Sequence, residues 1–247
     1  MSLKKISFKN EDEIIKHIRT KAPTLYISSQ TSTVIPYDKI EEYLGGENLV
    51  LGDLSSIPGT MEINDKKNLV VRGAISWKDA REFLKSKNYN IKTSPTEELA
   101  LILAEVATSC TGDRCFSFGN LRSQIESLKY LDHKGVEVKL IKEELFKHDS
   151  QTLLQYQKDY GLYTHHKNAP YPRFESSIDL MVGTEGQLGV ITEVELNIVE
   201  NFSVEHLFML IPKWEDDLDT HLEIIEKIQA FREDCILCEL IDSNSFE

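Results

Sequence analysis

The clearest alternation of apolar and polar positions in the chain runs from residue 190 to residue 199. Every second position carries a side chain suited to a buried sheet face: Val190, Thr192, Val194, Leu196 and Ile198. The positions between them carry Glu193, Glu195 and Asn197, which point the other way. The two glutamates are predicted to be solvated. A period of two over this length predicts a long β-strand with one buried face.

Three glycines precede this strand in quick succession. An apolar run at 180–182 is followed by Gly183, Gly186 and Gly189. Glycine at the entrance to a strand lets the backbone turn tightly and lets a ligand approach the main chain closely. Spaced glycines alone also fit an ordinary loop, so the pattern leaves a ligand site and a plain turn both open.

Capping residues and a period of 3.6 predict helices elsewhere in the chain. Asn10 followed by Glu13 predicts a helix that ends before Pro23, and Ser76 followed by Asp79 predicts another. The apolar stripes of these two helices are Ile14, Ile15 and Ile18, and Trp77, Ala80, Phe83 and Leu84. Further helical segments are expected at 38–44, 99–106, 143–160 and 216–232.

Short apolar and β-branched runs predict several more strands. These runs are 25–27, 48–53, 57–64, 67–72, 125–131 and 136–141. The 57–64 run is expected to pair with 67–72, and the last two runs are expected to form a hairpin. The polar or small-residue loops are 28–33, 107–112 and 164–176. The chain up to Val199 therefore mixes helices with paired strands.

The pattern changes after Val199. A strand at 204–211, a helix at 216–232 and a strand at 236–241 read as the start of a β-α-β unit, which has not closed when the sequence stops at Glu247. We therefore expect one domain over residues 1–200 and the beginning of a second, incomplete domain over residues 201–247.

The composition narrows the class of protein. Hydrophobic residues make up 40% of the 247 residues, which is enough for a packed core. The formal net charge of −13 argues against nucleic acid or an anionic membrane as the main partner, since both need a basic face. No apolar run approaches the roughly 20 residues that span a bilayer. The N-terminus lacks a signal-peptide pattern, so a cytoplasmic protein is expected.

The cysteines and histidines predict no metal site. Cys235 and Cys238 form a CxxC, but they lie in a predicted strand, where residues three apart face opposite sides. His165 and His166 are adjacent, and adjacent residues rarely ligate one ion, so a solvated loop is favoured. Arg114 fits either a phosphate or carboxylate contact or a packing ion pair.

The glycine segment resembles a family signature. Residues 183–192 read Gly-Thr-Glu-Gly-Gln-Leu-Gly-Val-Ile-Thr, which closely resembles the G-[ST]-E-G-x-L-G-[IV]-I-T string of FAD-linked oxidases of the vanillyl-alcohol oxidase type. Further segments resemble motifs of the same family in the same order: 51–57, 70–77, 107–112, 118–122 and 167–168. Residues 238–242 resemble a string from the family's cap domain.

This resemblance implies an α+β fold. It would be a PCMH-type FAD-binding domain of two α+β subdomains over residues 1–200, followed by the start of a substrate-covering cap domain. The family holds FAD between the subdomains with a first polar loop, a second small-residue loop and the main chain of the signature. The cofactor-binding residues implied here are Ser28, Ser29, Gln30, Thr31, Ser32, Thr33, Thr108, Ser109, Thr111, Gly112, Glu185, Gly189, Val190 and Ile191.

Two departures from the family pattern fall on the cofactor site. The first loop is usually R-G-G-G-[TS]-S, whereas 28–33 contains no glycine. Its hydroxyls can still donate to phosphate, but its backbone is expected to lose access to positive φ. A usual T-x-G-G string is replaced by Leu101-Ile102-Leu103-Ala104. A degenerate, flavin-free relative that acts as a non-catalytic subunit or partner therefore stands as the alternative to an enzyme.

The activity that the resemblance implies is oxidation of an alcohol or 2-hydroxy acid, as in glycolate or D-lactate oxidising enzymes, by hydride transfer to flavin N5. The implied partners are a small-molecule substrate and an electron-acceptor protein or the rest of the enzyme. The base would come from the cap region, so no catalytic residue is assigned. The motif around Cys110 differs from that of relatives with a cysteinyl-flavin link, which favours a buried free thiol. Glu185 is expected to brace the glycine loop through backbone hydrogen bonds.

Overall fold

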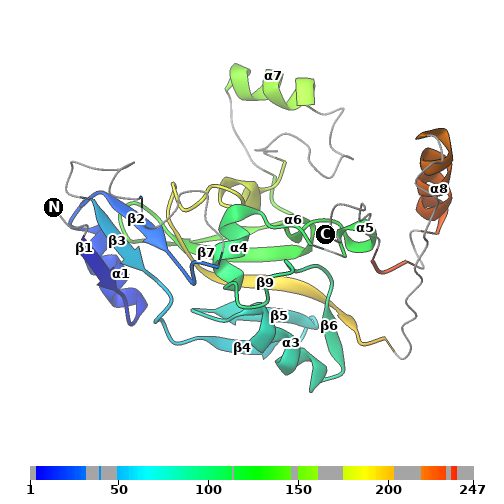
Figure 1. Ribbon diagram of the computed structural model, residues 1–247. Coiled ribbons are helices and arrows are strands. Elements are labelled where there is room, and N and C mark those ends of the chain that lie inside the picture. Colours follow the sequence, from blue (N-terminus) through cyan, green and yellow to red (C-terminus); the bar gives the residue numbers. More distant parts are fainter. Residues whose placement is uncertain are drawn as a thin grey trace.

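The computed structural model describes residues 4–31, 39, 49–112, 114–145, 150–160, 175–202, 218–231 and 235–237 (Figure 1). Two sheets organise these residues, one of six strands and one of three. The larger sheet and the helices packed on it hold the main hydrophobic core. The smaller sheet has a core of its own, which includes residues from the larger one.

The strand that follows the glycines lies at the centre of the large sheet. In spatial order the strands are β4 (Thr60–Ile63), β5 (Asn68–Arg72), β9 (Val190–Glu200), β7 (Ile125–Leu131) and β8 (Glu137–Ile141), and β6 (Tyr89–Ile91) pairs with the far end of β9. All of these pairs are antiparallel. The predicted long strand, the β4–β5 pair and the β7–β8 hairpin are therefore confirmed.

The polar face of β9 is not solvated as the alternation predicted. Glu193 is 9% exposed. Its carboxylate lies 2.5 Å from Arg72 Nε on β5 and 3.6 Å from Lys129 Nζ on β7. The side chains that donate hydrogen bonds to Glu195 are those of Asn64, Asn68 and Ser127. The prediction was wrong because a central strand has a neighbour on each side, and their side chains cover a face that one strand alone would leave in water.

Helices pack on the apolar face of the large sheet. They are α3 (Trp77–Lys85), α4 (Ile102–Thr108), α6 (Leu121–Gln124) and the 3-10 helix η3 (Ser177–Leu180), and α5 (Cys115–Phe118) precedes α6. Their fully buried side chains include Trp77, Leu84, Ile102, Leu121 and Ile178. Ser76 caps α3 as predicted, since its side chain accepts a hydrogen bond from the backbone N–H of Asp79 at 3.1 Å.

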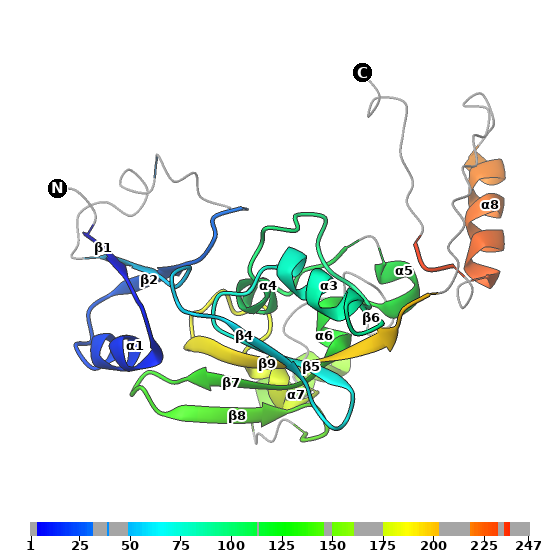
Figure 2. The ribbon, with the colours of Figure 1, turned by 90° about the horizontal axis from the view of Figure 1, so that it is seen from below.

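The small sheet lies at one end of the large one (Figure 2). Its strands are β1 (Lys4–Ser7), β3 (Val50–Asp53) and β2 (Thr24–Ile27), in the order β1-β3-β2, and both pairs are parallel. The helix α1 (Glu11–Ile18) joins β1 to β2. Phe8 and Ile14 pack in one cluster with Leu131 of β7 and Val190 of β9, so the two sheets share buried surface.

The remaining predictions have mixed outcomes. The Asn10 cap of α1 is confirmed, although the helix ends at Ile18, well before Pro23. The helix α7 (Gln151–Tyr160) is shorter than predicted, and Leu145 forms a bridge with Ser176. The helix α8 (Leu218–Ala230) is confirmed, whereas residues 235–237 form no strand. The predicted strand at 204–211, and nearly all of 38–44 and 164–176, lie outside the described residues. Among the residues described, no helix is long and apolar enough to cross a membrane.

Candidate functional site

A cavity of about 690 Å³ lies where the small sheet meets the large sheet and α4. Three segments that are far apart in the sequence provide most of its wall. They are residues 25–31, from β2 and the loop after it, residues within 101–111, from α4 and the loop after it, and residues within 185–192, where the signature enters β9. Sites for small molecules typically enclose roughly 300–1,000 Å³, so this cavity has the size of a ligand site.

The glycine signature contributes its main chain to the wall. Glu185 and Gly186 have φ angles of 53° and 77°, in the left-handed region. A Cβ at Gly189 would lie 2.3 Å from the carbonyl oxygen of Leu131, so no side chain fits there. The backbone N–H of Glu185 donates to the carbonyl oxygen of Ala107 at 2.9 Å, which ties the loop to the end of α4. The exposed Glu185 therefore braces this loop through its backbone.

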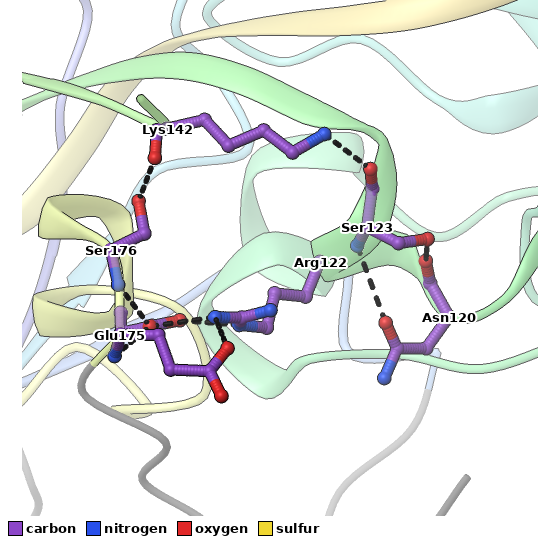
Figure 3. Close-up of polar contacts among 7 residues, drawn as sticks. Asn120, Arg122, Ser123, Lys142, Glu175 and Ser176 are labelled. Atoms are coloured by element: carbon purple, nitrogen blue, oxygen red, sulfur yellow. Dashed lines mark hydrogen bonds and ion pairs between the residues drawn. The ribbon is translucent and has the colours of Figure 1, made fainter. Parts of the chain in front are cut away.

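A buried ion pair holds the segment that leads into the signature (Figure 3). Asp179 in η3 is fully buried, and the Arg122 guanidinium engages both of its carboxylate oxygens, with Nη2 at 2.7 Å from Oδ2. The backbone N–H groups of Glu175 and Ser176 donate to the same carboxylate at 2.8 and 2.9 Å. The hydroxyl of Ser176 donates to the carbonyl oxygen of Lys142 at 2.6 Å. The sequence analysis missed Asp179, although two signals mark it: an acidic residue inside an apolar run, and Ser176 three residues before it, a capping-box spacing that the structure forms.

The end of α4 and the loop after it form the second wall. The cavity-lining residues of this loop are Thr108, Cys110 and Thr111. Ser109 and Gly112, which were also predicted to bind the cofactor, do not belong to the lining. Ser109 ends the helix with a φ of 55°. A Cβ at Gly112 would lie 1.8 Å from the carbonyl oxygen of Ser94, so this glycine is required by packing.

The loop after β2 forms the third wall. Its lining residues are Ser28, Ser29, Gln30 and Thr31, whereas Ser32 and Thr33 lie outside the described residues. Gln30 has a φ of 60°, so the loop reaches the left-handed region without a glycine. The expectation that this loop loses access to positive φ was wrong, because a single non-glycine residue adopts that region at a cost of roughly 1–2 kcal/mol.

The wall also carries a half-buried carboxyl group that the sequence analysis missed. Glu105 lies on α4, and burial raises the pKa of its carboxyl, a rise that hydrogen bonds with Cys110 and Thr108 only partly offset. Burial and the neighbouring Glu105 in turn raise the pKa of the Cys110 thiol far above its ordinary value. A thiol that stays protonated is a poor nucleophile. Neither Cys110 nor Cys115 forms a disulfide with a described residue.

Other residues singled out from the sequence lie elsewhere. Arg114 Nη1 donates to the carbonyl oxygen of Ile91 at 3.1 Å, so the guanidinium makes a packing contact. Residues 165–166 lie outside the described part of the chain, as does Cys238, and Cys235 is free. No group of three or more His, Cys, Asp or Glu side chains among the described residues is placed to hold a metal ion.

The volume of the cavity and the hydrogen-bond donors of its described wall fit a dinucleotide. Hydroxyl groups reach the wall from Ser28, Ser29, Thr31, Thr108 and Thr111. Gly186 and Gly189 also line the cavity, and no described residue accepts a hydrogen bond from the backbone N–H of either. Phosphate oxygens favour such donors, above all backbone N–H groups in a turn with positive φ. Apolar contact for flat rings is available from Leu25, Leu54, Ile57 and Ile191.

Comparison with known proteins supports the fold. No protein-family model and no curated protein matches the sequence. Two crystal forms of alkyldihydroxyacetonephosphate synthase are similar to this chain, with TM-scores of 0.55 and 0.53 at 11% and 12% sequence identity. Each match covers 79% of this chain but 31% of the synthase, so the chain spans less than a third of that protein. At this identity the likeness shows the fold alone, and it confirms the predicted class: α+β, with the architecture of a PCMH-type FAD-binding domain.

Proposed function

We propose that this chain is the flavin-binding portion of an FAD-dependent oxidoreductase. The observation that carries the proposal is that all three segments resembling the family's cofactor loops contribute to one cavity. Residues 28–31, 108–111 and 185–191 are remote in sequence, so only the fold brings them together. Local sequence pattern does not by itself create such a convergence, whereas a shared ligand requires it.

Each wall would hold a different part of FAD. The hydroxyl groups of the 28–31 loop and of Thr111 would donate to the phosphates, as would the backbone N–H groups of Gly186 and Gly189. The main chain of Val190 and Ile191 would lie along the nucleotide. Gly189 lies against Leu131 of β7, where no side chain fits, so packing requires a glycine at this point of the wall.

The proposed substrate is a small-molecule alcohol or 2-hydroxy acid. When bound, a flavin supplies a hydride acceptor for a carbon that bears a hydroxyl group. The residues described here would bind and orient the cofactor and exclude water through the apolar side chains of Leu101, Leu103 and Ile191. The base that takes the hydroxyl proton, and the protein that accepts the electrons, would come from outside these residues.

A second candidate is a flavin-free domain of the same fold that serves as a non-catalytic subunit or partner. Two observations favour it. Leu101, Leu103 and Ala104 line the cavity at the positions where the family usually carries T-x-G-G. The described wall also carries four glutamates, which a phosphate ligand would not favour.

The visible spectrum of the purified chain, recorded after incubation with FAD and desalting, tests the proposal. We expect about one retained flavin per chain, with absorption bands shifted in shape from those of free FAD. Thr111→Val should lower the retained fraction because it removes a hydroxyl from the wall. Thr60→Val, on β4 and away from the cavity, is the matched control and should have no effect. Loss of all flavin on desalting at every pH from about 5.5 to about 8 would contradict the proposal and favour the second candidate.

A further inference from the structure

The charge of the cavity does not match that of a dinucleotide. The carboxyl groups on its described wall are those of Glu11, Glu97, Glu105 and Glu185. The same described wall contains no lysine, arginine or histidine. A diphosphate would add further negative charge, and like charges repel more strongly in a partly desolvated space than in water.

Glu105 is the carboxyl group of this set that solvent screens least. Glu97 and Glu185 are exposed, so water and salt weaken their effect on a ligand. Glu11 is exposed as well, although partial burial also raises the pKa of its carboxyl. Glu105 is half-buried on α4, and its hydrogen-bond partners are the Cys110 thiol and the Thr108 hydroxyl. Neither partner carries a positive charge, so nothing in its described surroundings compensates the carboxylate.

The elements packed around Glu105 bring no cation to the cavity side. The helix α4 packs on β9 and β5, and the lining residues there are Ile191 and Thr192 on β9 and residues 73–74 after β5. The segment before α4 brings Glu97, the signature loop brings Glu185, and α1 brings Glu11. The nearest other titratable group is the thiol of Cys110, which stays neutral.

We propose that Glu105 makes this cavity select its ligand by charge, so that a flavin ring without phosphate binds independently of pH, whereas a flavin dinucleotide binds better when this carboxyl is protonated. The inference rests on the proposed function, since it concerns the same cavity. The physical reason is that the ionised carboxylate repels the diphosphate through a medium of lower dielectric constant than water.

The sign of the pH dependence follows from the burial of Glu105. Burial raises the pKa of its carboxyl, so the negative charge appears at a higher pH than it does on an exposed glutamate. As the pH falls through that pKa, the charge is lost and the affinity for FAD rises. By linkage, bound FAD raises the pKa of Glu105 further.

The test compares FAD with riboflavin, which has the same ring system and no phosphate. Dissociation constants are measured by flavin fluorescence at about pH 5.5 and about pH 8 for the wild type, Glu105→Gln and Glu82→Gln. Glutamine keeps the shape of the side chain and can still accept a hydrogen bond from Cys110. Glu82→Gln is the matched control, because it removes an exposed charge from α3, outside the cavity lining.

We expect the FAD affinity of the wild type to fall about tenfold from the lower to the higher pH, while the riboflavin affinity changes by less than about twofold. Glu105→Gln should remove most of the pH dependence for FAD and raise the affinity at the higher pH by about tenfold. Glu82→Gln should behave as the wild type does. The comparison of the two ligands uses the wild type, so it holds even where a variant fails to fold.

The outcomes separate this inference from the proposed function. Equal FAD affinities for the wild type and Glu105→Gln at both pH values would overturn the charge selection and leave FAD binding intact. A riboflavin affinity that varies with pH as strongly as that of FAD would also overturn it. Absence of flavin binding by both proteins would overturn both statements. Binding of FAD by Glu105→Gln but not by the wild type would support charge selection and place the natural protein with the flavin-free candidate.

Discussion

The polar face of β9 and the wall of the cavity both bury glutamate, but only β9 surrounds its glutamates with matched partners. Glu193 lies between Arg72 and Lys129, and Glu195 accepts three side-chain hydrogen bonds. Among the described residues, Glu105 in the cavity has a thiol and a hydroxyl as partners and no cation. The comparison indicates that the β9 carboxylates hold the sheet together, whereas the cavity carboxyl is left to interact with a ligand.

The two environments shift the pKa of glutamate in opposite directions. Burial by itself raises the pKa of Glu195, but hydrogen bonds from Asn68, Asn64 and Ser127 outweigh it, and the net shift is downward. Burial dominates at Glu105, and its pKa is raised. An ionised Glu195 therefore stabilises the folded state, whereas ionisation of Glu105 costs stability.

The largest expected effect comes from the fully buried carboxylate of Asp179. Arg122→Ala would leave it without its cation, so we expect the free energy of unfolding in urea to fall by about 3–5 kcal/mol. Flavin retention should fall as well, because the pair anchors the start of the glycine loop. Arg122→Lys keeps the charge but not the two-point geometry, and it should lie between the wild type and the alanine variant. A loss below about 1 kcal/mol for Arg122→Ala would show that the pair is not a structural anchor.

A smaller loss is expected when the polar face of β9 is broken. Glu195→Ala would leave three donors without their acceptor, and we expect about 2 kcal/mol of destabilisation at neutral pH in the same unfolding assay. Because the pKa of Glu195 is lowered, its contribution is present above its ordinary value and is lost as the pH falls through the folded-state pKa. The difference from the wild type should therefore shrink in acid. Glu200→Ala, at the exposed end of the same strand, is the control and should cost less than about 0.5 kcal/mol.

The smallest expected effect has the opposite sign. Glu105→Gln removes a charge whose appearance opposes folding, so we expect it to raise stability by about 0.5 kcal/mol at neutral pH, a figure discounted for solvent screening. Because the pKa of Glu105 is raised, the wild type loses stability as the pH climbs from the unfolded-state pKa to the folded-state pKa. The gain should therefore vanish in acid. A destabilised Glu105→Gln in a pH series of unfolding curves would show that this carboxyl is a structural partner like Glu195.

Local sequence was sufficient to predict those elements of secondary structure that depend on residues close together in the chain. The Asn10 and Ser76 caps, the β4–β5 pair, the β7–β8 hairpin and the long β9 strand are confirmed. Helix caps and hairpins are determined by contacts within a few residues of sequence. The alternation of apolar and polar residues follows from the pleat of a single strand, whose successive side chains point to opposite faces. The resemblance carried by residues 183–192 added the fold class, which the likeness to the synthase structures confirms.

Tertiary structure decided which polar side chains are paired. A single strand cannot show that Arg72 and Lys129 cover Glu193, or that Arg122 reaches Asp179 across 57 residues of sequence. The tertiary structure also decided which residues of each predicted loop line the cavity. Gly112 packs against Ser94, whereas Thr111 lines the cavity. The electrostatic environment of Glu105 depends on segments from three parts of the chain. The burial of a polar side chain and the identity of its partners depend on all the residues around it in space, and only the folded chain specifies those residues.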